Sequence, residues 1–144
     1  MKKIVLLIVI TFSLYGLSAN SPNFLQAYAG QSSTDDRALS SAFENRQSDI
    51  QVQGSGTVIK ILADDTNGSR HQRFILKIAS GQTLLVAHNI DLAPRINGLR
   101  KGDTVSFYGE YEWNPKGGLV HWTHHDPSRN HIGGWLKHNG STYQ

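Results

Sequence analysis

The sequence predicts an all-β fold, a small five-stranded barrel with a short N-terminal helix and an irregular C-terminal tail. Two observations predict it. From residue 51 onward apolar residues alternate with polar ones at a period of two, which is typical of half-buried strands. Clusters rich in Gly, Asn, Asp and Pro divide this region into five short segments.

The N-terminal segment has the layout of a secretory signal peptide. Residues 1–3 supply positive charge, and residues 4–17 form an apolar run that is shorter than the roughly 18 to 20 residues of a membrane span. Small residues fit a cleavage site after Ala19 or after Ala29, so residues 1–29 are assigned to the signal. We therefore expect an exported protein, periplasmic or secreted, without a membrane span.

Composition restricts the mature chain to one domain and a near-neutral charge. Removing Lys2 and Lys3 from the fourteen Lys and Arg residues leaves twelve against eleven Asp and Glu, a net charge of about +1. A general electrostatic attraction to nucleic acid or membrane is thereby excluded, although a local basic patch is not. The chain has no cysteine, so stability depends on the core of a domain of roughly 115 to 125 residues, expected to be a monomer.

Residues 30–50 are polar and have two interpretations. Thr34 is suited to cap a short surface helix whose first turn carries Asp35 and Asp36, where negative charge complements the helix dipole. Such a helix would have a narrow apolar stripe, made of Ala38, Leu39, Ala42 and Phe43. The alternative is an exported linker.

Three strands follow in meander order. The first begins at Gln51 and places Val52, Gly54, Gly56 and Val58 on one side, with two glycines that allow it to coil. Residues 64–69, Asp-Asp-Thr-Asn-Gly-Ser, form a hairpin turn into a second strand over 70–79, with Phe74, Leu76 and Ile78 inward. A turn at residues 80–82 leads to a third strand over 83–88.

The next residues complete the barrel. Residues 89–101 predict a loop that holds a short helix, and residues 104–113 a fourth strand whose inward face is Val105, Phe107, Gly109, Tyr111 and Trp113. After a turn at 114–118, the fifth strand runs from Leu119 to His124 or His125. The predicted order is three strands, a loop or helix, and then a hairpin. This is the order of an oligonucleotide/oligosaccharide-binding (OB) barrel, and the alternative architecture is an open sandwich.

The C-terminal residues 126–144 are rich in both glycine and aromatic residues. We expect an irregular tail that packs on the barrel, anchored by Trp135 and Leu136. Residues 51–144 would then form one OB-like domain.

Four strings carry a resemblance to a known family: residues 71–74 (HQRF), 87–92 (AHNIDL), 109–114 (GEYEWN) and 121–127 (HWTHHDP). Over residues 54–143 the chain resembles an uncharacterised bacterial family, the domain of unknown function numbered 3465. The resemblance implies kinship with other exported single-domain proteins and no particular activity.

Histidines near the C-terminus suggest a metal site. Imidazole is a good ligand for zinc, and the expected ligands of a divalent metal such as zinc are His124, Asp126, His131 and His138. The spacing weakens this hypothesis, because the familiar short zinc patterns are missing. The alternative is that these histidines form hydrogen bonds between the strand ends and the tail.

The same region suggests acid–base chemistry without a metal. His124 or His125 would act as the base or acid, Asp126 would orient it, and His131 would complete the group. Arg129 or Arg73 would neutralise an anionic transition state. This combination is suited to phosphodiester cleavage. The string His121-Trp122-Thr123 resembles one of the two His-x-Thr elements that two-histidine phosphoesterases need, and the second is missing.

A ligand-binding surface is the remaining hypothesis, and whether the protein is an enzyme stays open. Glu110 and Glu112 are roughly 7 Å apart on one strand face, a separation compatible with glycoside hydrolysis, although such pairs are usually solvated. Trp122 is suited to stacking, unless it belongs to the core. The candidate ligand-binding residues are His71, Arg73, His88, Glu110, Glu112, His121 and Trp122.

From the sequence, the favoured function is an exported OB-like module that binds a polar or anionic ligand, such as nucleic acid or glycan. The alternative is a metal-dependent or histidine-based hydrolase of phosphodiesters. The sequence contains no G-x-S-x-G elbow, no cysteine nucleophile and no phosphate-binding glycine loop followed by Lys.

Overall fold

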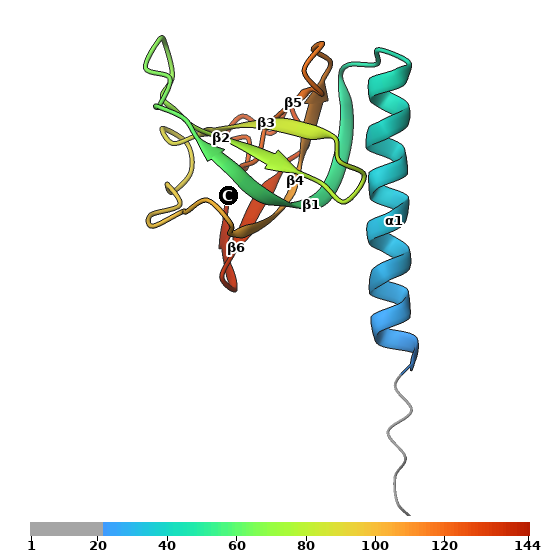
Figure 1. The fold of residues 1–144 in the computed structure, drawn as a ribbon. Helices are drawn as coiled ribbons and strands as arrows, with labels where there is room; N and C mark the ends of the chain where they lie inside the picture. The colour runs from blue at the N-terminus through green and yellow to red at the C-terminus, as the bar shows by residue number, and fades with distance from the viewer. Residues whose placement is uncertain (1–21) are drawn as a thin grey trace, which may run out of the picture.

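The structure is a computed structural model that describes residues 22–144 (Figure 1). The predicted signal residues up to 21, with the cleavage site after Ala19, lie outside this range, and Ala29 lies within the first helix. The elements in order are α1 (Pro22–Glu44), β1 (Ile50–Ile61), β2 (His71–Lys77), β3 (Thr83–Asn89), β4 (Thr104–Glu112), β5 (Leu119–His121), β6 (Trp135–His138) and β7 (Ser141–Tyr143).

Five strands close into a barrel. The sheet order is β1-β2-β3-β5-β4, and β4 pairs with β1 again to complete the circle. β3 and β5 are parallel and the other neighbours are antiparallel. This is the predicted OB-like barrel, and the closure rules out the open sandwich.

β1 is long because it belongs to both halves of the barrel. Residues 50–57 pair with β4, and residues 57–61 pair with β2 after a register shift between Val58 and Lys60. The strand curves between the two partners, as its glycines predict.

The alternation of the strands fills the barrel with apolar side chains. The inward faces predicted for the second and fourth strands are confirmed by Phe74, Leu76, Val105, Phe107 and Tyr111, which are fully buried. Trp113 is the exception, because β4 ends at Glu112 and its side chain is only partly buried. On β4 the even-numbered residues from 104 to 112 therefore point outward. This outward face carries the candidate functional site.

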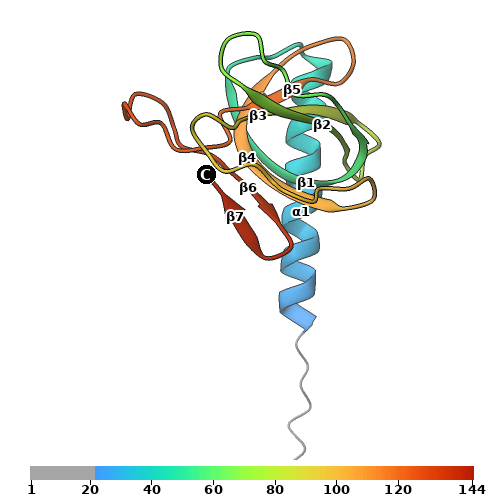
Figure 2. The same cartoon turned by 90° about the vertical axis from the view of Figure 1, so that its left-hand side faces the viewer.

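The N-terminal helix differs from the prediction. It is longer than expected and begins at Pro22, so Thr34 lies inside it and does not cap it. Figure 2, which looks into the barrel, shows α1 crossing behind one end of it. Leu39 and Ala42 are fully buried there, and the Asp36 carboxylate accepts a hydrogen bond from the Ser80 backbone N–H. The helix thus covers an end of the barrel.

Three other predictions are corrected. Residues 90–103 form turns without a helix, and β2 ends at Lys77. β5 ends at His121, because Trp122 has a left-handed backbone (φ 52°) that breaks the strand. His124 and His125 therefore lie in a loop.

The C-terminal tail is a hairpin. β6 pairs with β4 and then with β7, so the sheet extends beyond the barrel. Asn139 and Gly140 join the two strands, both with positive φ (48° and 77°), as a tight hairpin turn requires. Leu136 is fully buried and Trp135 half-buried, which agrees with their expected packing on the barrel.

Among residues 22–144, no helix has the length and apolar character that crossing a membrane requires.

Candidate functional site

The site lies on the outward face of β4, where β1 and β5 flank it. Glu110 is paired with Gln51 of β1 on one side and with His121 of β5 on the other, so the three residues form one cross-strand row. Gly109 permits this arrangement. A Cβ atom at Gly109 would collide with the His121 carbonyl oxygen, so only glycine lets β5 lie this close to β4.

Glu110, Glu112 and His121 form what we call the carboxylate–imidazole cluster. One ligand atom from each lies within 4.8 Å of the other two. His121 Nε2 is 3.5 Å from Glu112 Oε1. The two glutamates are separated by roughly 7 Å along the strand, but their side chains converge, which brings three potential metal ligands together.

Two nitrogen atoms beside this cluster are buried without a hydrogen bond. These are His121 Nε2 and Gln51 Nε2, the outer members of the row that has Glu110 at its centre. Buried polar atoms are nearly always hydrogen-bonded, and an exception calls for an explanation such as a missing ion or water. An imidazole nitrogen in this position is suited to coordinate a cation.

The cluster concentrates negative charge. Burial, followed by the neighbouring carboxylates of Asp49 and Glu110, raises the pKa of Glu112 to about 7. Burial also lowers the pKa of His121, against the opposing effect of Glu110. The imidazole is therefore held in the neutral form that binds metals, next to carboxylates whose repulsion a cation would relieve.

His131 reaches the cluster from the loop 122–134. Its Nε2 contacts Glu110 Oε2, and its ring stacks on Trp122 with centroids 4.0 Å apart and planes 11° from parallel. Its Nδ1–H donates to the Ile132 carbonyl oxygen (2.7 Å). Metal-binding histidines usually donate their second ring N–H in this way, because it fixes the tautomer and the ring orientation.

Burial alone would lower the pKa of His131, but its contacts with the Ile132 carbonyl and the Glu110 carboxylate raise it. His131 is thus oriented toward the cluster by its surroundings.

Asp126 holds the loop in place. Its carboxylate accepts hydrogen bonds from the Ser128 hydroxyl and from the backbone N–H groups of Ser128, Asn130 and His131. The Ser128 hydroxyl and these backbone donors lower the pKa of Asp126 to about 2. Its oxygens are engaged within the loop, where they position His131.

A pocket opens beside His131. It has a volume of about 510 Å³ and is lined by His125, Asp126, Pro127, Arg129, His131 and Gly133. His125 and Arg129 are exposed. The pocket thus places the Arg129 guanidinium and the His125 imidazole in the same cavity as His131, which contacts Glu110.

The structure does not assemble the metal ligands expected from the sequence. The one metal-like group among the described residues is the carboxylate–imidazole cluster, which shares none of the four expected ligands. His124 donates to the His125 carbonyl oxygen (2.7 Å), and His138 Nε2 lies 2.8 Å from Asp103 Oδ2. Only His131 of the expected set approaches the cluster.

Other candidates from the sequence are bonded elsewhere. His88 is fully buried, with Nδ1 at 2.8 Å from Thr123 Oγ1 and Nε2 at 2.9 Å from the Pro94 oxygen. His71 Nδ1 lies 2.8 Å from the Ser69 oxygen, and Arg73 donates to the Ala63 oxygen. Trp122 is half-buried and supports His131, so it is not a core residue.

Sequence reasoning missed Gln51 and Asp49. The sequence pattern could have identified Gln51, because it is a polar residue at an outward position of the first strand. Such a residue lies beside the outward residues of the fourth strand where the two strands pair. Asp49 precedes β1 in a left-handed conformation (φ 59°), which the pattern does not reveal.

The molecule is therefore a small OB-like barrel protein with a carboxylate–imidazole cluster on its outer face. A family model described as "Protein of unknown function (DUF3465)" matches residues 23–144. The chain belongs to this family, which confirms the resemblance found in the sequence. A comparison with curated proteins finds no match.

Proposed function

We propose that the protein is an exported, metal-dependent hydrolase of phosphodiesters, with Glu110, Glu112 and His121 as metal ligands. The observation that carries the proposal is the convergence of these three groups around a buried His121 Nε2 that has no hydrogen-bond partner. His131 is suited to be a fourth ligand or to orient Glu110.

The donor set indicates the metal. Two carboxylates and one imidazole combine hard and borderline ligands, which suit zinc and manganese. No cysteine is available to favour softer metals. We expect a divalent first-row ion with open positions for water and substrate.

The charge of the site supports an anionic substrate that binds through the metal. Without a cation, Glu110, Glu112 and Asp49 would repel a phosphate, whereas a bound ion would attract it. Arg129 in the adjoining pocket supplies a second positive charge.

The reaction class follows from this arrangement. A metal ion held by Glu110, Glu112 and His121 would activate water and neutralise charge on the phosphate. In the hydrolysis, a water oxygen would attack phosphorus and the water would lose a proton. The bond from phosphorus to the leaving oxygen breaks, and that oxygen keeps the electron pair and takes up a proton.

Binding without turnover is the second candidate. The sequence favoured a module for a polar or anionic ligand, and the pocket with Arg129 and His125 is compatible with one. A turnover assay separates the two functions, because both need the metal and only the hydrolase releases product. Export to the periplasm or medium remains part of the proposal, supported by residues 1–17 of the sequence.

Metal content is the first test. The mature protein would be purified untagged from the periplasm and measured by native mass spectrometry with and without a chelator. We expect one metal ion per chain, lost on chelation and absent from Glu110→Gln and His121→Ala. His138→Gln is the matched control, because His138 is an imidazole bound to Asp103 outside the cluster. A wild-type protein that carries no metal and takes up neither zinc nor manganese would refute the proposal.

Turnover is the second test, with bis(4-nitrophenyl) phosphate as a chromogenic phosphodiester. We expect hydrolysis that requires added zinc or manganese and falls at least a hundredfold in Glu110→Gln. If the metal binds but no phosphodiester is cleaved, the protein is a metal-dependent binding module.

A further inference from the structure

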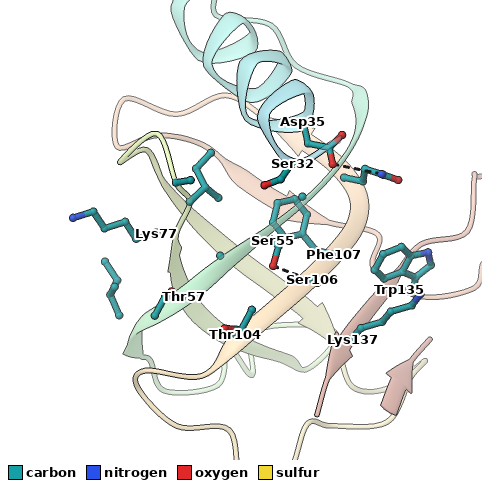
Figure 3. Close-up of a pocket in the computed structure, with 16 residues that line it drawn as sticks. Ser32, Asp35, Ser55, Thr57, Lys77, Thr104, Ser106, Phe107, Trp135 and Lys137 are labelled. Atoms are coloured by element: carbon teal, nitrogen blue, oxygen red, sulfur yellow. Dashed lines mark hydrogen bonds between the residues drawn. The ribbon is translucent and has the colours of Figure 1, made fainter. Parts of the chain in front are cut away.

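A groove lies on the outside of the barrel, where three barrel strands meet α1 and β6, the two elements outside the barrel that help to line it. It has a volume of about 810 Å³ and lies between α1, the strands β1 and β4, the end of β2, and β6 (Figure 3). α1 and β6 form two of its walls. Trp135 and Lys137 come from β6, and Ser55 and Ser106 lie between the walls.

The groove continues toward the carboxylate–imidazole cluster along the outward face of β4. The strand register gives successive cross-strand rows. Ser55, Ser106 and Lys137 form one row, and Gln53, Tyr108 and Trp135 form the next. The row of Gln51, Glu110 and His121 follows directly. Ser106 and Glu110 are four residues apart, roughly 14 Å along the strand. An extended ligand could therefore contact both sites at once.

The lining of the groove is suited to a negatively charged chain. Lys137 Nζ lies 4.4 Å from the centre of the Trp135 ring, and Lys77 stands on the other side of the groove (Figure 3). Asp35 is the one acidic residue among the described residues that line it. The groove is thus positive, in contrast to the cluster at its end.

The groove also offers an aromatic surface. Trp135 and Tyr108 form a pair with ring centroids 6.1 Å apart and planes tilted by 32°. Aromatic rings next to cationic side chains are the combination that binds single-stranded nucleic acids, because bases stack on the rings while the backbone phosphates contact the cations. Ser55, Thr57, Thr104 and Ser106 add hydroxyl groups, which are able to donate hydrogen bonds to phosphate or sugar oxygens. Between them, the Ser106 hydroxyl donates to Ser55 Oγ (3.3 Å).

We infer that this groove binds a single-stranded oligonucleotide and leads its backbone to the carboxylate–imidazole cluster. The inference rests on the proposed function, since it names the substrate class of that hydrolase. With two lysines, the binding is modest and salt-dependent. The slope of log affinity against log salt is about −1.4, from about −0.7 for each contacted phosphate on a single strand.

The test measures fluorescence anisotropy of a labelled twelve-residue oligothymidylate in the presence of a chelator, so that the result does not depend on the metal. We expect Trp135→Ala and the double variant Lys77→Ala/Lys137→Ala each to weaken binding about tenfold or more. The double variant also brings the salt slope close to zero. Lys116→Ala is the matched control, since Lys116 is an exposed lysine in the turn between β4 and β5. Oligouridylate in a parallel titration distinguishes RNA from DNA.

Three outcomes separate the inference from the proposed function. Binding that depends on Lys77, Lys137 and Trp135, without hydrolysis when metal is added, supports the groove and refutes the hydrolase. Hydrolysis of oligothymidylate with an unchanged KM in these variants refutes the groove alone. A sulfated oligosaccharide that displaces the oligonucleotide and binds more tightly through the same residues would overturn the assignment to nucleic acid.

Discussion

Two groups of histidines in this barrel look alike in the sequence and differ in the structure. In the first group, His88, His124 and His138 contact a hydroxyl, backbone carbonyls or a carboxylate. In the second group, His121 has a buried Nε2 without a hydrogen bond, and His131 turns its Nε2 toward Glu110. Four of these five histidines lie between residues 121 and 138, so position along the chain does not separate the groups.

The difference shows how a structural histidine is distinguished from a candidate ligand. A neutral imidazole has one donor and one acceptor nitrogen, and His88 uses both inside the protein. Such a residue contributes to stability and has no free nitrogen for a metal. His121 keeps a nitrogen beside two carboxylates that only a cation or a proton can neutralise.

The largest expected effect is the acid sensitivity that His88, a member of the first group, gives the folded state. Burial lowers the pKa of His88 from 6.5 to about 4, against the opposing effect of its hydrogen bond with the Pro94 carbonyl oxygen. The unfolded chain takes up this proton more readily, so the stability that His88 provides is complete above pH 6.5 and is lost as the pH falls toward 4. The loss is about 3 kcal/mol, because a tenfold difference in proton affinity between the folded and the unfolded chain corresponds to about 1.4 kcal/mol.

Urea unfolding of the wild type and of His88→Gln between pH 7 and 4 would measure this loss. Glutamine preserves a donor and an acceptor but does not titrate, so the difference between the two curves isolates His88. Parallel curves would show that His88 is not the acid-sensitive group.

Without metal, the carboxylate–imidazole cluster should give the folded state a pH dependence opposite to that of His88. The folded pKa of Glu112 is raised from 4.5 to about 7, so protonation stabilises the folded state as the pH falls through 7. In a chelator, Glu112→Gln should remove this stabilisation.

The second effect in size is stabilisation by the metal. A ligand present at a hundred times its Kd stabilises the folded state by about 2.7 kcal/mol, which corresponds to a rise in Tm of roughly 10 °C for a domain of this size. We expect this rise with zinc or manganese in the wild type and not in Glu110→Gln. His125→Ala, which removes an exposed imidazole outside the cluster, should retain it. The same rise in all three proteins would place the metal elsewhere.

A third, smaller effect concerns the loop that carries His131. Asp126→Ala removes the acceptor of the backbone N–H groups of Asn130 and His131, so His131 is no longer held over Glu110. We expect the metal affinity to fall about tenfold, as for other residues that orient ligands. Isothermal titration of the variant with zinc measures the change. Ser128→Ala keeps the backbone hydrogen bonds to Asp126 and should change the affinity less.

Much of the barrel could be predicted because each strand has one buried face. The alternation of apolar residues identified all five barrel strands, and their order identified the fold. The tail was missed although Asn139-Gly140 is a strong hairpin signal, because the glycines and aromatic residues around it obscured the two short strands. The helix was predicted too short, since its contact at the end of the barrel depends on long-range packing of Leu39 against Gly54 and Phe107.

The site was harder to predict because its residues are brought together by the register in which the strands pair, and the sequence does not reveal that register. Glu110, Glu112 and His121 were all candidate residues. The two glutamates were considered only as a pair, and the metal was assigned to Asp126 and three later histidines. Only the pairing of β4 with β5 brings His121 beside Glu110. The spacing of His124, His131 and His138 along the chain gave no information on this, because a loop and a hairpin intervene.

The smallest expected effect concerns His138, which the sequence proposed as a metal ligand. Its Nε2 lies beside Asp103 and its side chain is buried, so it belongs to the first group. His138→Gln can place an amide N–H at the same position and should change the free energy of unfolding by less than about 1 kcal/mol. Metal affinity should not change. A loss of metal affinity in His138→Gln would contradict the division into two groups. His138 would then affect metal binding although it lies outside the row of Gln51, Glu110 and His121.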